Sequence, residues 1–340
     1  MNYLHPFTLK ELNALVNFRK GETKYGEKVI TMHLEESFEA QLQKSDAPYV
    51  LLGISEDIGV LANFGFKGTR NAYTSVIKSL LNTQHNKYNK GSLLHILGEL
   101  RFDDLQKKAD SLNPQKEAEL NQLYDFVDII DKEVSYWIQQ IVAAGKKPIV
   151  IGGGHNNAYG IIKGCALALN KSMNVINFDA HTDLRKLEGR HSGNGFSYAY
   201  EEGFLKKYYV FGLHENYTPK TIFKNMKAQP EIFQYATFEE LYTRREKGAD
   251  YELNKAIEFI KGTKFGVEID CDAIEGVPSS AMSPSGFTVN EIRRFIAMLA
   301  TNKNIAYIHL CESAPNIENT IETRQVGKML TYFITDFIQS

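Results

Sequence analysis

The stretch from Lys147 to Arg185 limits most strongly what this chain can fold into. It contains two short apolar runs, KPIVIGG (147–153) and MNVINFDAH (173–181), joined by a segment of helical character. Strands joined by a helix are typical of a parallel sheet with helices on both faces. Polar residues follow each run: His155 after the first, and Asp179, His181 and Asp183 after the second. Ligands bind beyond the carboxyl ends of such strands, so we expect these side chains to meet there.

The residues after the second run favour a metal site. Asp179, His181 and Asp183 alternate with two other residues, so their side chains can point the same way if the chain is still extended. Asp270 and Asp272 show the same spacing at the end of a third apolar run. Like charges on one face repel, and a cation is the simplest compensation. Together with His155, these residues make four carboxylates and two imidazoles, a set that suits two metal ions sharing carboxylate ligands.

The proportion of carboxylates predicts the chemistry of these ions. Carboxylate-rich sites favour Mn²⁺ or a similar ion over structural zinc, which prefers cysteine and histidine. Two such ions can generate hydroxide from water at neutral pH and stabilise a tetrahedral intermediate. The sequence contains no G-x-S-x-G or Cys/His catalytic signature. We therefore expect a hydrolase that needs no nucleophilic side chain. A nucleotide-binding glycine loop at Gly152–Gly154 is disfavoured because G-x-G-x-x-G fails at Asn157.

The rest of the chain predicts one α/β domain over residues 1–340. Further apolar runs at 47–55, 208–213 and 304–315 end in polar residues and alternate with helical stretches, of which 101–146 is the longest. This rhythm indicates a mostly parallel sheet covered on both faces. We interpret residues 1–45 as an amphipathic helical extension packed on that domain.

Composition narrows the class of partner. The net charge of -2 and the pI near 6.5 give no electrostatic reason to expect nucleic acid or an anionic membrane. The apolar residues are dispersed in short runs, and the start of the chain lacks the order of a signal peptide. Three cysteines without a spacing motif make a disulfide framework unexpected. We expect a cytoplasmic protein with a small-molecule partner.

The three polar motifs carry a resemblance to a known family. GGGHNNAYG, NFDAHTDLR and EIDCDAI resemble the metal-binding motifs of the arginase, agmatinase and formimidoylglutamase family, the ureohydrolases. The resemblance implies a three-layer α/β/α sandwich around a mostly parallel sheet, two Mn²⁺ ions, and a homo-oligomer. It also implies that one ion is held by His155, Asp179, Asp183 and Asp270, and the other by His181, Asp179, Asp270 and Asp272.

Two further positions match the family. Glu312 in CESAP occupies the place of the glutamate that contacts the amidine or guanidinium group of the substrate, although a solvated acid at a strand end is the alternative. Arg185 resembles the arginine of formimidoylglutamases, and its guanidinium could grip a carboxylate bidentately or form a structural salt bridge. The resemblance also implies that Asp183 orients the attacking hydroxide.

The departures from the family bear on the substrate. Arginases and agmatinases carry a proton-shuttling histidine where RHSGNGF places Ser192, which disfavours arginine and agmatine. His191 beside it could still shuttle protons or bind substrate, or lie at the surface. Arg190 and Asn194 are candidates to hold the carboxylates of the substrate. Gly154, Glu275 and Gly276 also differ from the family pattern, without removing a metal ligand.

The leading hypothesis is therefore a binuclear manganese hydrolase that converts N-formimidoyl-L-glutamate to L-glutamate and formamide in histidine breakdown. The nearest alternative is an arginase, agmatinase or guanidino acid hydrolase that releases urea. A catalytically silent binding protein of the same fold is the second alternative, because a fold does not determine a function. Lysine deacetylases share the fold with a single zinc, but the paired aspartates and His155 favour two ions.

Overall fold

A ten-stranded sheet forms the centre of the structure, which is a computed structural model and describes residues 3–339; Met1, Asn2 and Ser340 lie outside the described residues. The strand order is β1-β4-β3-β5-β10-β9-β6-β7-β8, and β2 pairs with β4. β1 is antiparallel to β4, and the other pairs are parallel. The strands span Leu4–Pro6 (β1), Ile30–Thr31 (β2), Tyr49–Ser55 (β3), Leu94–Arg101 (β4), Lys147–Ile151 (β5), Met173–Phe178 (β6), Leu205–Leu213 (β7), Phe233–Thr237 (β8), Phe265–Asp270 (β9) and Ile305–Cys311 (β10).

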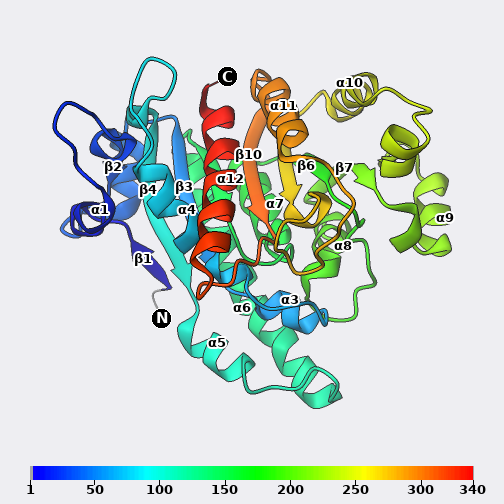
Figure 1. The fold of residues 1–340 in the computed structure, drawn as a ribbon. Helices are drawn as coiled ribbons and strands as arrows, with labels where there is room; N and C mark the ends of the chain where they lie inside the picture. The colour runs from blue at the N-terminus through cyan, green and yellow to red at the C-terminus, as the bar shows by residue number, and fades with distance from the viewer. Residues whose placement is uncertain (1–2, 340) are drawn as a thin grey trace.

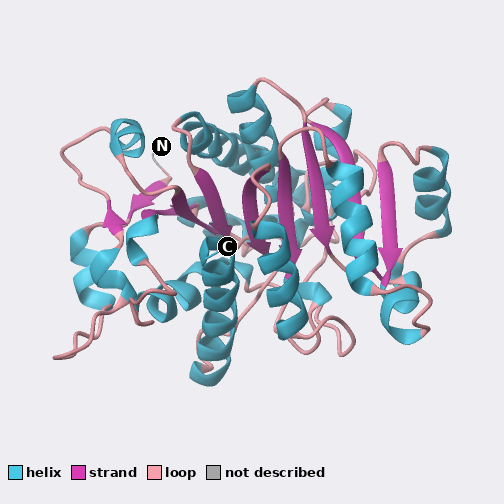
Figure 2. Ribbon diagram, turned by 90° about the horizontal axis from the view of Figure 1, so that it is seen from above, coloured by secondary structure: helices cyan, strands magenta, loops and turns pink. Residues whose placement is uncertain are grey.

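Helices cover both faces of the sheet, so the chain forms three layers (Figures 1 and 2). The helices α4, α10, α11 and α12 share one buried apolar cluster with the sheet, and α3, α6, α7 and α8 share a second cluster on the opposite face. The α-helices span Leu9–Leu15 (α1), Phe38–Lys44 (α2), Ile58–Ala62 (α3), Ala72–Leu81 (α4), Asp103–Ala109 (α5), Glu117–Ala143 (α6), Asn157–Leu169 (α7), Gly195–Glu201 (α8), Lys220–Ala228 (α9), Ala249–Ile260 (α10), Val289–Ala300 (α11) and Thr320–Gln339 (α12). The predicted three-layer sandwich around a mostly parallel sheet is confirmed.

The apolar pattern explains why these elements form. The central strands β5, β6, β9 and β10 are buried along nearly their whole length, and a strand covered on both faces has a continuous apolar run. In α6, by contrast, buried residues recur at three- and four-residue intervals from Leu123 to Ile141, so one stripe of the helix faces the sheet. Among the described residues, the helices are too short or too polar to cross a membrane.

The structure contains four strands that the sequence analysis did not predict: β1, β2, β4 and β8. Residues 1–45 contain α1 and α2, but also β1 and β2, which join the sheet beside β4. No strand was predicted at β4 or β8. In β8 the residues FQYAT are only partly apolar. In β4, Gly98 has φ +130°, and a Cβ there would lie 2.1 Å from the carbonyl oxygen of His5, so a glycine in this strand permits the close approach of β1.

Candidate binuclear metal centre

Four adjacent strands end together at the candidate site. In the pairing of β5 with β10, Ile151 lies opposite Leu310; in β10 with β9, Cys311 lies opposite Asp270; and in β9 with β6, Ile269 lies opposite Phe178. The polar residues that follow these strands therefore begin at the same height along the sheet. This register brings residues more than a hundred positions apart into one pocket.

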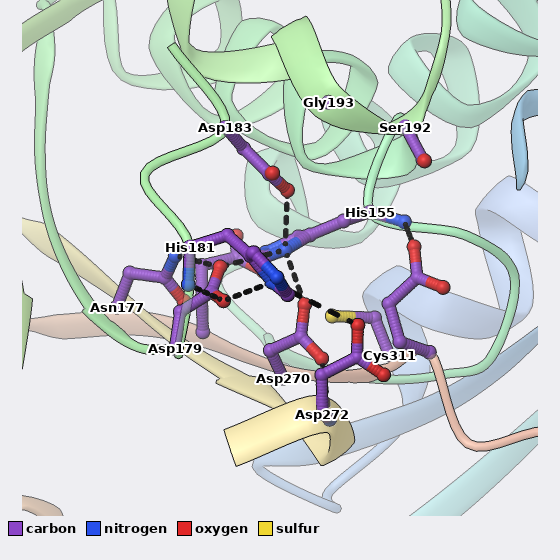
Figure 3. A network of polar contacts seen from close by, with 12 residues as sticks. His155, Asn177, Asp179, His181, Asp183, Ser192, Gly193, Asp270, Asp272 and Cys311 are labelled. Carbon is purple, nitrogen blue, oxygen red and sulfur yellow. Dashed lines mark hydrogen bonds and ion pairs between the residues drawn. The ribbon is translucent and has the colours of Figure 1, made fainter. Parts of the chain in front are cut away.

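The side chain of His155 lies at the centre of the site. Its Nδ1 is 2.9 Å from a carboxylate oxygen of Asp270, 3.0 Å from Asp183 and 3.4 Å from Asp179. The ligand atoms of these four residues all lie within 4.8 Å of one another. Figure 3 shows Asp183 approaching His155 from one side and Asp270 from the other. The set combines one imidazole with three carboxylates.

His181 and Asp272 extend this group on one side (Figure 3). The Nδ1 of His181 is 3.5 Å from an oxygen of Asp179 and 3.9 Å from an oxygen of Asp272. The structure therefore brings all six predicted metal ligands together. Asp179 lies between the two imidazoles and has a carboxylate oxygen facing each of them, which is the placement that a ligand shared by two ions requires.

The local backbone conformation differs from the expected one. The sequence suggested that the ligand side chains alternate along extended strands. β6 ends at Phe178, and Asp183 has a left-handed φ of +48°. The carboxylate of Asp179 accepts a hydrogen bond from the backbone N–H of His181, and that of Asp270 accepts one from Asp272. These bonds fold both segments into tight turns. The side chains spaced two residues apart do converge, but tight turns after the strands, and not extended strands, direct them into the site.

The electrostatics of the site favour a cation. Burial and the neighbouring carboxylates raise the pKa values of Asp183 and Asp270 above the usual range for aspartate. The Nδ1 of His155 is buried among three carboxylates and has no hydrogen-bond partner among the described residues. A divalent ion would neutralise the repulsion and use this nitrogen as a ligand, so the donor set fits the Mn²⁺ that the sequence predicts.

Glu312 follows β10 directly and is also buried. One carboxylate oxygen accepts a hydrogen bond from the backbone N–H of His155, and the other has no partner among the described residues. Burial and the charge of Asp272 raise the pKa of Glu312 to about 8. The left-handed φ of +59° at Glu312 is uncommon for a residue with a side chain, and such strain is typical of functional positions. An unpaired buried carboxylate is suited to a cationic group of a ligand.

A buried glutamate that the sequence analysis did not single out holds the loop around His155. Glu56 follows β3 and accepts hydrogen bonds from the backbone N–H groups of Ile58, Gly59 and Gly154 and from the side chain of Asn157. These bonds tie the loop after β3 to the loop after β5. The sequence signal was an acid directly after an apolar run, which looks the same as a solvated acid at a strand end.

Arg190 and Asn194 lie inside the protein. Arg190 is 3% exposed, and its guanidinium donates to both carboxylate oxygens of Asp131, to the side chain of Asn194 and to the carbonyl of Asn156. It also stacks on the rings of Tyr159 and Tyr198. The amide nitrogen of Asn194 donates to backbone carbonyls of the same loop. The side-chain groups that were predicted to hold the substrate thus make hydrogen bonds within the protein.

His191 and Arg185 lie in different surroundings. His191 is buried, and its Nδ1 accepts a hydrogen bond from the backbone of Gly193, while burial and the nearby arginines lower its pKa to about 3. A histidine whose pKa lies far below the working pH is a poor proton shuttle. Arg185, in contrast, is exposed, and among the described residues its guanidinium has no ion pair or hydrogen bond. Its stem passes beside Gly193, which lies near Asp183 (Figure 3).

A cleft of about 650 Å³ opens beside the predicted metal ligands and is lined by one of them, His181. Its walls include His181, Tyr217, Met282 and Phe66, and Lys67 brings a positive charge. The ammonium of Lys67 lies 3.0 Å from a carboxylate oxygen of Asp110. The cleft is large enough for a small molecule to approach the six ligands. The segment after β3, which contributes Phe66 and Lys67, therefore borders the site.

Comparisons with known proteins assign the family. The arginase family model matches residues 47–335, and the chain belongs to this family. A formimidoylglutamase of Streptococcus pyogenes is 24% identical over 218 residues, which cover 62% of this chain and 66% of that relative. The match thus spans a little under two thirds of the length of these curated relatives.

Solved structures share the fold. A formiminoglutamase of Trypanosoma cruzi with Mn²⁺ has a TM-score of 0.70 at 19% identity, covering 93% of this chain and 99% of that one. The formimidoylglutamase of Bacillus subtilis has a TM-score of 0.69 at 17% identity, covering 94% and 93%. At these identities the likeness establishes the common architecture.

Replacing Arg190 by alanine is expected to destabilise the fold by about 3–5 kcal/mol, because it leaves the buried carboxylate of Asp131 unpaired. Urea denaturation measures this loss. The matched control is Arg294→Ala, which removes an exposed ion pair with Asp250 and should cost less than about 1 kcal/mol. If Arg190→Ala leaves the stability unchanged and raises the KM for the substrate, the prediction that Arg190 binds substrate is supported instead.

The metal-free protein is expected to lose stability as the pH rises from 6.5 to 8. Burial raises the pKa of Glu312 to about 8, and Asp179 raises that of His181 to about 10 against the effect of burial, so in this window both hold protons that the unfolded chain releases. The lowered pKa values of His191 and His95 act below this window. A thermal melt series checks the trend. Mn²⁺ should raise Tm more at pH 8 than at pH 6.5, because its ligands must be deprotonated. A metal-free Tm that rises over this range would contradict the account.

Proposed function

We propose that this chain is a binuclear manganese hydrolase that cleaves a C–N bond of N-formimidoyl-L-glutamate and releases L-glutamate and formamide. One observation carries the proposal: His155, Asp179 and Asp270 gather with three further predicted ligand residues at the carboxyl ends of β5, β6 and β9. The choice of substrate is supported by the formimidoylglutamases among the relatives.

In this proposal two ions share the site. The first would be held by His155, Asp179, Asp183 and Asp270, and the second by His181, Asp179, Asp270 and Asp272. When bound, the pair activates water at neutral pH and acts as a Lewis acid. Manganese is favoured because four of the six donors are carboxylates and none is a thiolate.

Glu312 and Asp183 would act on the substrate and on the attacking water. The free carboxylate oxygen of Glu312 is available to accept hydrogen bonds from a cationic amidine, whose charge favours the ionised form of the glutamate. Asp183 is the most accessible of the carboxylates around His155, and its side chain is 14% exposed. It can therefore accept a hydrogen bond from the water and orient it toward the amidine carbon.

Arg185 would bind the acidic end of the substrate. Its guanidinium is exposed and uncommitted among the described residues, and its stem lies over Gly193 beside Asp183. A planar guanidinium can bind a carboxylate bidentately. Arg190, His191 and Asn194 would instead keep the loop that carries Arg185 in shape, because their side chains are buried and hydrogen-bonded within it.

The proposal is tested by assaying the Mn²⁺-loaded protein on formimidoylglutamate, arginine, agmatine and guanidino acids. We expect formamide from the first and little urea from the others. Urea from a guanidino compound would identify the alternative activity within the family. Absence of turnover on the whole panel by a protein that contains two ions per chain would support the silent binding protein instead.

Asp272→Ala is expected to bind one Mn²⁺ per chain in place of two and to lose activity by about a hundredfold or more, because only one of the proposed ions depends on Asp272. Metal analysis by mass spectrometry and the formamide assay measure the two effects. The control is the exposed Asp125→Ala, which should keep both ions. Full turnover by a variant that contains a single ion would exclude the binuclear mechanism.

Arg185→Ala is expected to raise KM for formimidoylglutamate by about tenfold to a hundredfold and to change kcat little, because it removes a charged contact that is made equally in the bound substrate and the transition state. Steady-state kinetics separate the two constants. Lys186→Ala removes the neighbouring exposed charge and should leave KM unchanged. An unchanged KM in Arg185→Ala would assign Arg185 a structural role.

A further inference from the structure

A second polar cluster lies behind His155, on the side away from the six proposed ligands. Glu268 of β9 and His309 of β10 are paired in register on adjacent strands, and both are 0% exposed. The Nδ1 of His309 lies 2.7 Å from one carboxylate oxygen of Glu268, and the hydroxyl of Tyr307 donates to the other at 2.6 Å. Burying the charged carboxylate of Glu268 destabilises the fold unless its oxygens are paired, so this residue is a candidate for a functional role.

The contacts of His309 and Tyr307 hold the carboxylate of Glu268 in one orientation. His309 faces an acceptor on each side, because its Nε2 lies 3.2 Å from the carbonyl oxygen of Gly152 and its Nδ1 faces Glu268. The imidazole of His309 contacts one carboxylate oxygen of Glu268, and the hydroxyl of Tyr307 donates to the other, so both oxygens of this buried carboxylate have a partner.

This cluster is arranged as a hydrogen-bond network and not as a further metal site. Ligand atoms of His155, Glu268, His309 and Cys311 lie close enough together to hold an ion. However, both ring nitrogens of His309 already face acceptors, and the carboxylate of Glu268 is shared between Tyr307 and His309. The thiol of Cys311 is directed to the carbonyl oxygen of Ile269 at 3.6 Å. An ion would have to break these contacts.

The network faces the free nitrogen of His155. The Nε2 of His155 has no hydrogen-bond partner with good geometry among the described residues, and it is buried. A carboxylate oxygen of Glu268 lies 3.5 Å from it. The other ring nitrogen, Nδ1, faces the carboxylates of Asp179, Asp183 and Asp270. The imidazole of His155 is thus placed between the proposed ions and an anionic acceptor.

We propose that Glu268, oriented by His309 and Tyr307, is a positioning residue for the metal centre: its carboxylate lies where it can take the Nε2–H of His155 when an ion binds, which leaves the bare Nδ1 to the ion. This inference rests on the proposed binuclear centre. Metal-binding histidines commonly donate their second N–H to a carboxylate, which fixes the tautomer and the ring orientation and makes the ligand more basic. Here the acceptor is held in turn by the imidazole of His309 and the hydroxyl of Tyr307, so its own orientation is also determined.

Glu268→Gln tests the inference, because it keeps the shape of the side chain and removes the negative charge. Titration of the full-length, metal-free protein with Mn²⁺, followed by electron paramagnetic resonance of free Mn²⁺, should show one of the two sites weakened by about tenfold to a hundredfold. This readout does not depend on activity. The second site should change less, because His181 does not contact Glu268.

The matched control is Glu252→Gln. Glu252 is also a buried glutamate near a tyrosine hydroxyl, that of Tyr209, but it lies on α10 and none of its contacts is a proposed metal ligand. Its substitution should leave both Mn²⁺ affinities unchanged. Equal affinities for Glu268→Gln and the wild-type protein would overturn the inference.

Tyr307→Phe supplies a second measurement, and it decides the question if Glu268→Gln does not fold. It keeps the carboxylate but removes one of the hydrogen bonds that orient it, so one Mn²⁺ site should weaken by about threefold to tenfold. Wild-type affinity in a folded Tyr307→Phe would count against the network. A wild-type protein that binds two ions but turns over none of the panel would contradict the proposed function and leave this inference standing.

Discussion

The main electrostatic constraint on this structure is a group of carboxylates at the carboxyl ends of the central strands. Asp179, Asp270 and Glu312 leave neighbouring strands at the same level, and Asp183 and Asp272 follow within a few residues. Buried carboxylates at such short separations repel one another, and burial adds to the cost. Two imidazoles offset part of this cost, and cations would offset the remainder. The repulsion between these carboxylates, and its compensation by positive charge, therefore affects both the local stability of the strand ends and the chemistry of the site.

Buried polar groups around the site hold the loops that carry these carboxylates and imidazoles. Glu56 ties the loop of His155 to β3, and Arg190 with Asp131 holds the loop that follows Asp183 against α6. Glu268 lies on the Nε2 side of His155 and is held there by contacts with His309 and Tyr307. Each of these groups is buried and paired, so each specifies one loop conformation. These groups allow Asp183 and Glu312 to retain left-handed backbone conformations that isolated residues rarely adopt.

The sequence predicted the centre of the molecule better than its edges. The runs that became β5, β6, β9 and β10 are apolar because these strands are buried on both faces, and such runs are readable without coordinates. The edge strands β1, β2 and β8 lack that signal. Arg190 and Asn194 were predicted to bind substrate from residue type and from proximity to the motif alone. A buried salt bridge to Asp131, 59 positions earlier, cannot be seen in a local pattern.

The sequence by itself determined the α/β class, the order of the motifs and the identity of six donors whose chemistry favours divalent ions. These properties follow from local periodicity and from the side chains themselves. The tertiary structure alone decided which nitrogen of His155 faces the carboxylates, which arginine is free and which is buried, and that Glu268 stands behind the site. These outcomes depend on strand register and on turns that aim each side chain, and both are set by contacts between residues far apart in the chain.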